Sequence, residues 1–199
     1  MRALILADLH FTDWNKWQTF LQIDRSRFDI IFLLGDIDIM LLESIKKHFA
    51  EKPIIGVHGN HDYPGDLSHF GIADIHGRVA NFKGTRFLGV EGCVRYKAGE
   101  APIHEQKDIT TLLQAMPPVD IVLSHNSPKG IHDKPDIAHV GYEGLRSYID
   151  SHQPKYVLHG HQHSNQRTMV GSTEVINIYG GVLFDTESGQ IQQLLHVDE

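Results

Sequence analysis

Five short polar motifs occur along this chain, and each of them follows an apolar run. In chain order they are Asp8-Leu9-His10, Gly35-Asp36, Gly59-Asn60-His61-Asp62, Ser124-His125-Asn126 and Gly160-His161-Gln162-His163. Carboxylates and an amide carbonyl are hard oxygen ligands, and imidazole suits borderline metals such as zinc, manganese and iron. Two such ions, held about 3.5–4 Å apart, generate a hydroxide-like nucleophile and neutralise phosphoryl oxygens. The motifs therefore indicate metal-dependent hydrolysis of a phosphate ester, and neither a calcium site nor a thiolate-bound structural zinc.

At these residues the sequence resembles the calcineurin-like metallophosphoesterase family, whose pattern is D-x-H, GD, GNH[DE], H and GHxH. The resemblance runs from Met1 to about Tyr179, and all five motifs are intact. It implies an α/β fold, a four-layer αββα sandwich of two mixed β-sheets flanked by helices. In that fold each motif lies at the carboxyl end of a strand.

The resemblance also implies a role for each motif residue. The implied ligands are Asp8, His10 and His163 for a first metal and Asn60, His125 and His161 for a second, with Asp36 bridging the two. His61 would be an outer-sphere catalytic histidine that contacts the phosphate or protonates the leaving oxygen. Asp62 would assist it by orienting the imidazole. The expected cofactors are two divalent ions; manganese is favoured, with zinc, iron, nickel or magnesium as alternatives.

Length and composition are those of an ordinary soluble globular protein. The 199 residues are 41% apolar and 22% charged, which suits one α/β domain spanning residues 1–199. No apolar stretch approaches the roughly 20 residues needed to span a bilayer, and a strand is predicted directly after Met1, so we expect no signal segment. The single Cys93 fits a reducing compartment. We therefore expect a cytoplasmic protein without a membrane partner, in an oligomeric state that the sequence does not indicate.

The formal net charge is −7. Affinity for long nucleic acid comes mainly from lysine and arginine, which release counterions from the phosphates. Two bound divalent ions would offset four charges and leave about −3, so the protein would stay acidic. We expect a small phosphorylated substrate and no long nucleic acid.

Alternation of apolar runs with helical patterns predicts the elements that position the motifs. The first third has a βαβαβ pattern, with strands at 2–7, 28–34 and 53–57 and helices at 15–23 and 39–49. This pattern predicts a parallel sheet with ligands at the carboxyl ends of its strands. Further strands are predicted at 79–82, 85–90, 119–123, 155–158, 173–179 and 190–196, and further helices at 105–116 and 142–151.

Several polar residues outside the motifs have simpler interpretations. We expect Asp38 to be a helix cap or surface residue, and His58 and His159 to pack behind the site. Asp74-Ile75-His76-Gly77 copies D-x-H, but it follows no buried strand, so a structural role is expected. His48, His69, His104, His152 and His196 are expected on the surface, and Cys93 is expected to be buried or half-buried next to a strand.

The segment from Ser127 to His139 has little apolar periodicity and lies between two metal motifs. A loop there would overhang the metals and could select substrate. Its S-P after the metal histidine, then G-I-x-D and H-V-G, resembles the class III phosphodiesterase branch. An ordinary surface connection is the alternative.

Departures from the family's protein phosphatases narrow the predicted substrate. Those enzymes have G-D-x-x-D-R-G, a glutamate ending the third motif and a glycine after D-x-H, whereas this chain has Ile37-Asp38-Ile39, Asp62 and Phe11. We therefore predict a phosphoesterase for a small phosphodiester, nucleotide-like or a cyclic nucleotide. A phosphomonoesterase with the same site is the first alternative, and a protein-binding scaffold, as in a retromer subunit of this fold, is the second. A DNA-repair-type nuclease would need more length and a basic surface.

Overall fold

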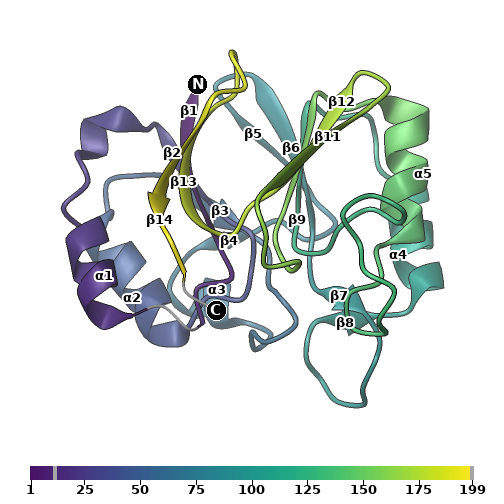
Figure 1. Cartoon of the computed structure of the whole chain (residues 1–199), viewed down its shortest axis with the longest axis horizontal. Coiled ribbons are helices and arrows are strands. Elements are labelled where there is room, and N and C mark those ends of the chain that lie inside the picture. Colours follow the sequence, from purple (N-terminus) through teal and green to yellow (C-terminus); the bar gives the residue numbers. More distant parts are fainter. Residues whose placement is uncertain (11–12, 198–199) are drawn as a thin grey trace.

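Two six-stranded β-sheets face each other and are flanked by helices in the computed structural model, which describes residues 1–10 and 13–197 (Figure 1). The first sheet has the order β14-β13-β1-β2-β3-β4, and the second has the order β11-β12-β10-β9-β6-β5. Both sheets combine parallel and antiparallel pairs. The predicted α/β fold of two mixed sheets flanked by helices is confirmed.

The first sheet is built on the predicted βαβαβ unit. Its parallel strands are β1 (Arg2–Ala7), β2 (Ile30–Leu33), β3 (Ile54–Gly56) and the short β4 (Ala73–Asp74). Strands β13 (Gly180–Asp185) and β14 (Ile191–Leu195) extend it antiparallel beyond β1. The carboxyl ends of β1, β2 and β3 therefore lie at one edge of the sheet.

The second sheet has a parallel centre with an antiparallel strand at each side. Its centre consists of β6 (Thr85–Val90), β9 (Ile121–Ser124), β10 (Tyr156–His159) and β12 (Thr173–Asn177). The outer strands are β5 (Val79–Phe82), which forms an antiparallel hairpin with β6, and β11 (Gln166–Val170). The two-residue strands β7 (Cys93–Val94) and β8 (Ile103–His104) form a separate parallel pair, in which Cys93 is buried.

Helices cover the outer face of each sheet (Figure 1). Helices α1 (Trp14–Phe20) and α2 (Ile39–His48) lie on the first sheet, and the Trp17 Nε1–H of α1 donates to Ser44 Oγ of α2 at 3.0 Å. Helices α4 (Gln106–Gln114) and α5 (Glu143–His152) lie on the second. A short helix α3 (Asp66–His69) and a 3₁₀ turn (Arg25–Arg27) complete the helical elements described.

Alternating side chains of the central strands fill three separate cores, one between the sheets and one under the helices of each sheet. On β1, Leu4 and Leu6 pack under α1 and α2, whereas Ile5 points between the sheets, where it joins a cluster containing Phe32 and Phe87. A strand buried on both faces needs an unbroken apolar run, which explains why the sequence pattern identified it.

The elements missed by sequence reasoning are short, polar or glycine-rich. Strand β13 begins with Gly180 and Gly181 and carries no clear alternation, and β11 is exposed along most of its length. Both are edge or near-edge strands that tertiary pairing stabilises, so their local sequence signal is weak. Among the described residues, no helix combines the length and apolarity needed to cross a membrane.

Candidate metal centre

The five motifs meet where the carboxyl ends of strands from both sheets converge. Asp8 follows β1, Asp36 follows β2, and Asn60 lies in the loop after β3. From the second sheet, His125 follows β9 and His161 follows β10. Ligand atoms of Asp36, His125 and His161 all lie within 4.8 Å of one another, and all three residues are buried. The fold therefore joins two halves of a site whose nearest predicted ligands, Asn60 and His125, are 65 residues apart in the chain.

Backbone carbonyls determine which nitrogen of three predicted histidine ligands carries a proton. His10 donates from Nδ1 to the Asp36 carbonyl at 3.4 Å, and His125 donates from Nδ1 to the Leu34 carbonyl at 2.8 Å. His161 donates from Nε2 to the Ala138 carbonyl at 2.8 Å. In the neutral imidazole the other nitrogen then keeps a lone pair. This is the outer-shell arrangement that orients metal-binding histidines.

The lone pair of His125 meets other acceptors instead of a donor. Its Nε2 lies 3.0 Å from Asn60 Oδ1 and 3.5 Å from Asp36 Oδ2. Because burial lowers the pKa of His125, a second ring proton that would relieve this contact is disfavoured. Three acceptor atoms that face one another in a buried site are the donor set that a cation satisfies, so these residues fit the second implied metal.

The residues predicted for the first metal also lie together. Asp8 Oδ1 is buried without a hydrogen-bond partner among the described residues and lies 3.8 Å from His163 Nε2. The His10 ring lies 5.6 Å from the His163 ring. The His163 ring in turn stacks on Tyr179 with the centroids 5.1 Å apart. A buried, unpartnered carboxylate oxygen beside an imidazole nitrogen fits the first implied metal.

Backbone strain is concentrated at the same place. Of the seven described residues other than glycine with positive φ, four are predicted ligands: Asp8, Asp36, His161 and His163. Residues other than glycine rarely adopt this left-handed backbone conformation. Strain of this kind persists where the surrounding structure enforces it, often at functional sites.

The protonation equilibria of the centre are strongly displaced. Burial, followed by repulsion from Asp36, raises the pKa of Asp8 well above its ordinary value and that of Asp62 to about 7. Burial, followed by neighbouring imidazoles, lowers the pKa of His161 well below its ordinary value and that of His163 to about 4. Bound cations at such a place would stabilise the ionised form of the buried carboxylates beside the neutral imidazoles.

Two motif glycines give the chain room to approach the carboxylates. A Cβ at Gly59 would lie 2.0 Å from Asp36 Oδ1, and a Cβ at Gly160 would lie 2.7 Å from Asp8 Oδ2. No side chain fits at these positions without displacing a predicted ligand.

The two predicted catalytic residues occupy different environments. His61 is exposed, its ring lies 5.2 Å from that of His10, and its backbone N–H donates to Asp36 Oδ1 at 2.8 Å. We expected Asp62 to orient the His61 imidazole. Instead, the buried Asp62 carboxylate accepts from the backbone N–H groups of Asp36, Ile37 and Gly59 at 2.9, 3.1 and 2.6 Å. Two of these three amides belong to the loop after β2, so Asp62 supports the loop that carries Asp36.

One residue of the site was not expected from the sequence. Asn60 Nδ2 donates to the Tyr96 hydroxyl at 3.3 Å, which directs Asn60 Oδ1 toward His125. Tyr96 lies in the exposed loop between β7 and β8, thirty-six residues from Asn60. A single tyrosine in a polar loop carries no local signal, so only the tertiary structure identifies it.

The segment from Ser127 to His139 contacts the fifth motif. Besides the bond from His161 to Ala138, Gln162 Nε2 donates to the His139 carbonyl at 3.0 Å, and Lys134 Nζ donates to the Gln162 carbonyl at 3.1 Å. The loop thus supports a predicted ligand; its expected selection of substrate stays a prediction. His159, expected to pack behind the site, is buried and accepts at Nε2 from His132 of this loop at 3.0 Å.

A second cluster of ligand-type side chains surrounds Glu91. His58 Nδ1 lies 3.2 Å from Glu91 Oε2, His104 Nε2 lies 3.2 Å from Glu91 Oε1, and Asp74 and His76 are close by. The predicted structural role of the Asp74 motif fits this position, since Asp74 Oδ1 accepts from the His76 backbone N–H at 2.9 Å. His104, expected on the surface, is half-buried here because its ring stacks on that of His76. Asp38, in contrast, caps α2 as expected.

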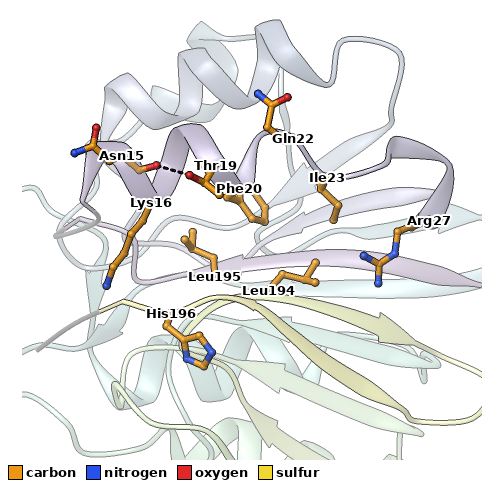
Figure 2. A pocket seen from close by; sticks show the side chains of 10 residues that line it. All are labelled: Asn15, Lys16, Thr19, Phe20, Gln22, Ile23, Arg27, Leu194, Leu195 and His196. Carbon is orange, nitrogen blue, oxygen red and sulfur yellow. Dashed lines mark hydrogen bonds between the residues drawn. The ribbon is translucent and has the colours of Figure 1, made fainter.

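A groove of about 700 Å³ lies elsewhere, between α1 and β14. Figure 2 shows Phe20, Leu194 and Leu195 along its floor and Lys16, Arg27 and His196 around it. None of the predicted ligands lines this groove, so it is separate from the chemistry of the five motifs.

Comparison with known proteins agrees with this geometry. Residues 1–198 match the model of the calcineurin-like phosphoesterase superfamily domain, and the chain belongs to this superfamily of phosphoester hydrolases. Comparison with the curated proteins gives no match.

Solved structures share the fold at low sequence identity. A Thermus thermophilus protein, TT1561, has a TM-score of 0.73 and 17% identity, with 96% of each chain covered. An archaeal phosphodiesterase has a TM-score of 0.59 and 15% identity, covering 98% of this chain and 100% of its own. A dimetal phosphatase from Danio rerio has a TM-score of 0.61 and 15% identity, covering 92% and 91%. At these identities the likeness shows the fold alone.

Proposed function

We propose that this protein is a dinuclear metal-dependent phosphoesterase that hydrolyses a small phosphodiester. Asp8, His10 and His163 would bind one ion, Asn60, His125 and His161 the other, with Asp36 between them. The observation that carries the proposal is the direction of the histidine lone pairs. His125 donates from Nδ1 to the Leu34 carbonyl. Its Nε2 therefore presents a lone pair to Asn60 Oδ1 and Asp36 Oδ2.

When bound, the two ions would supply a hydroxide-like nucleophile and neutralise the phosphoryl oxygens. The chain's own residues would contact the phosphate, protonate the leaving oxygen and hold the ligands in place. His61 is exposed beside His10, where it can contact the phosphate and donate a proton to the leaving oxygen. Asp62 would act through the loop, because its three amide hydrogen bonds hold Asp36 in place.

A diester is favoured by the polar loop above His161 and by the absence of the protein-phosphatase motifs. An archaeal phosphodiesterase and a dimetal phosphatase share the fold, so the phosphomonoesterase alternative stays open. Manganese is the ion we favour, because the donor set mixes carboxylate, amide and imidazole. The formal charge of −7 argues against long nucleic acid as substrate, and a cytoplasmic protein remains our expectation.

Elemental analysis and a substrate panel test this proposal. Protein loaded with manganese should retain two ions per chain and cleave bis(p-nitrophenyl) phosphate and a cyclic nucleotide, with weak activity on phosphopeptides. If p-nitrophenyl phosphate is cleaved with at least tenfold higher kcat/KM than every diester, a difference of about 1.4 kcal/mol in transition-state stabilisation, the monoesterase alternative is correct. Metal-loaded protein that cleaves neither class would favour the scaffold alternative.

A further inference from the structure

We propose that a cleft beside His10 binds one aromatic ring of the substrate's leaving group. The cleft measures about 170 Å³ and is lined by Leu9, His10, Trp14, Asp38, Met40 and Leu41. This inference rests on the proposed function, because it assigns the cleft to the organic part of a phosphoester whose phosphate lies at the metals.

Exposed apolar side chains lie shortly after the motifs, three of them in the first turns of α1 and α2. Seven large hydrophobic side chains are exposed among the described residues, and four of them lie within four residues after a motif: Trp14, Ile39, Met40 and Tyr63 are 51%, 49%, 64% and 75% exposed. Single exposed apolar residues are ordinary, but a group of them beside polar groups indicates a binding surface. Trp14 and Met40 line the same cleft, with the predicted ligand His10 at its wall.

Both walls of the cleft are held at helix N-termini. Asp13 caps α1, since its Oδ1 accepts from the backbone N–H groups of Asn15 and Lys16 at 3.0 Å. Asp38 caps α2, since its Oδ1 accepts from the Met40 N–H at 2.8 Å. The backbones of Trp14 and Met40 are therefore positioned before any ligand arrives, which reduces the entropy lost on binding.

Size and charge define the chemistry of the ligand. A cavity of about 150 Å³ holds one benzene ring, so a cleft of about 170 Å³ suits a single ring and excludes a long chain. Indole and thioether side chains both make favourable contacts with aromatic rings. Among the residues that the structure describes, the lining contains the Asp38 carboxylate and neither lysine nor arginine. A neutral ring bearing an N–H donor therefore fits, whereas a second phosphate group does not.

The position of the cleft assigns the ring to the leaving group. The His10 ring lies 5.2 Å from the ring of His61. If His61 protonates the leaving oxygen, as proposed above, the group attached to that oxygen lies next to His10 and can enter the cleft.

Two small phosphonates separate this inference from the proposed function. Methylphosphonate offers only the group that binds metal, and phenylphosphonate adds one ring. Calorimetry with manganese-loaded protein should show phenylphosphonate binding at least tenfold more tightly. Tryptophan fluorescence should change with phenylphosphonate alone, because Trp14 is exposed and the second tryptophan, Trp17, is fully buried.

Matched variants identify the cleft as the cause. Met40→Ala and Trp14→Ala should reduce the preference for phenylphosphonate to about twofold or less without changing methylphosphonate affinity, and Trp14→Phe should retain most of it. Met169→Ala is the control, because Met169 is 59% exposed on β11 and lies outside the cleft; its preference should equal that of the wild type.

Equal affinity for the two phosphonates, or an equal loss in Met40→Ala and Met169→Ala, would overturn the cleft while leaving the phosphoesterase proposal intact. No binding of methylphosphonate to metal-loaded protein would instead overturn the proposed function, and the cleft assignment with it.

Discussion

The centre around Asp36 and the cluster around Glu91 are built from the same residue types, yet their imidazoles carry protons in opposite directions. At Asp36, Nδ1 of His125 points away from the carboxylate and donates to a backbone carbonyl, so Nε2 presents a lone pair to the carboxylate. At Glu91, His58 Nε2 accepts from the backbone N–H of Leu67 at 3.5 Å. His76 Nδ1 accepts from the backbone N–H of Glu91 at 3.1 Å. The other ring nitrogens, Nδ1 of His58 and Nε2 of His76, then carry the protons and face the Glu91 carboxylate.

This difference decides what each cluster can hold. Lone pairs directed at a carboxylate need a cation, whereas N–H groups directed at a carboxylate satisfy it without one. The Glu91 cluster is therefore a hydrogen-bonded structural element, although its residues lie close enough for a metal. Proximity of histidine and carboxylate is not sufficient; the backbone partner of each imidazole determines the outcome.

The largest expected effect comes from Asp36→Asn. Changes to outer-shell residues weaken metal binding by about 10–100-fold, and loss of the carboxylate that we propose as the bridge should exceed that range and abolish activity. Elemental analysis should find neither ion in this variant and two in Glu91→Gln. The comparison of the two clusters fails if Glu91→Gln loses an ion or Asp36→Asn keeps both.

His61→Gln tests whether an exposed histidine beside the centre is a ligand or a proton donor. Loss of general-acid assistance should lower kcat by about 10²–10⁴-fold, while metal content stays at two ions per chain. Single-turnover kinetics and elemental analysis on the same sample measure both. A variant that loses metal would show that His61 is a ligand.

Glu91→Gln should lower the free energy of unfolding, whereas Asp36→Asn should lower the metal content. Burial alone would raise the pKa of Glu91, but the imidazoles of His104 and His58 lower it well below its ordinary value of 4.5. Because folded Glu91 binds its proton less tightly than unfolded Glu91, this stabilisation is present above pH 4.5 and is lost as the pH falls below it. Glu91→Gln removes a charged hydrogen-bond acceptor, which should lower the free energy of unfolding by about 2 kcal/mol.

Urea unfolding of chelator-treated protein measures this cost. The wild type should exceed Glu91→Gln in free energy of unfolding at pH 5.5, and the gap should shrink at pH 3.5. A gap that grows on acidification would contradict the assigned proton positions.

The smallest expected effect is that of Tyr96→Phe. Without the hydroxyl, the Asn60 amide loses the hydrogen bond that directs Oδ1 toward His125. Affinity for the second ion should fall by about tenfold, at the lower end of outer-shell effects, while the first ion stays bound. Manganese titration followed by calorimetry resolves the two sites, and Tyr63→Phe, with its side chain 75% exposed, is the control. Unchanged affinity would limit Tyr96 to a packing role.

Local sequence predicted much of this protein because its central strands and its motifs carry strong local signals. An apolar run such as Ile30–Leu33 has to be buried on both faces, and a motif at its end has to lie at the edge of a parallel sheet. The order of the motifs then identified Asp8, Asp36, Asn60, His125 and His161 as candidate ligands before any geometry was known. Strand β13 escaped prediction because its glycine-rich start is stabilised by pairing with β1 and not by local pattern.

Only the tertiary structure decided how the side chains are used. Asp62 was expected to orient His61, but its carboxylate accepts from three backbone amides, two in the loop after β2 and one, that of Gly59, in its own loop. Tyr96 reaches Asn60 from a loop without any motif, and the cleft of Trp14 and Met40 forms between the starts of two helices. Hydrogen-bond direction, burial and shared cavities depend on contacts between segments far apart in the chain, which residue types and spacing do not encode. The sequence thus determined which chemical groups are present and at which strand ends, and packing determined which of their atoms are left free to act.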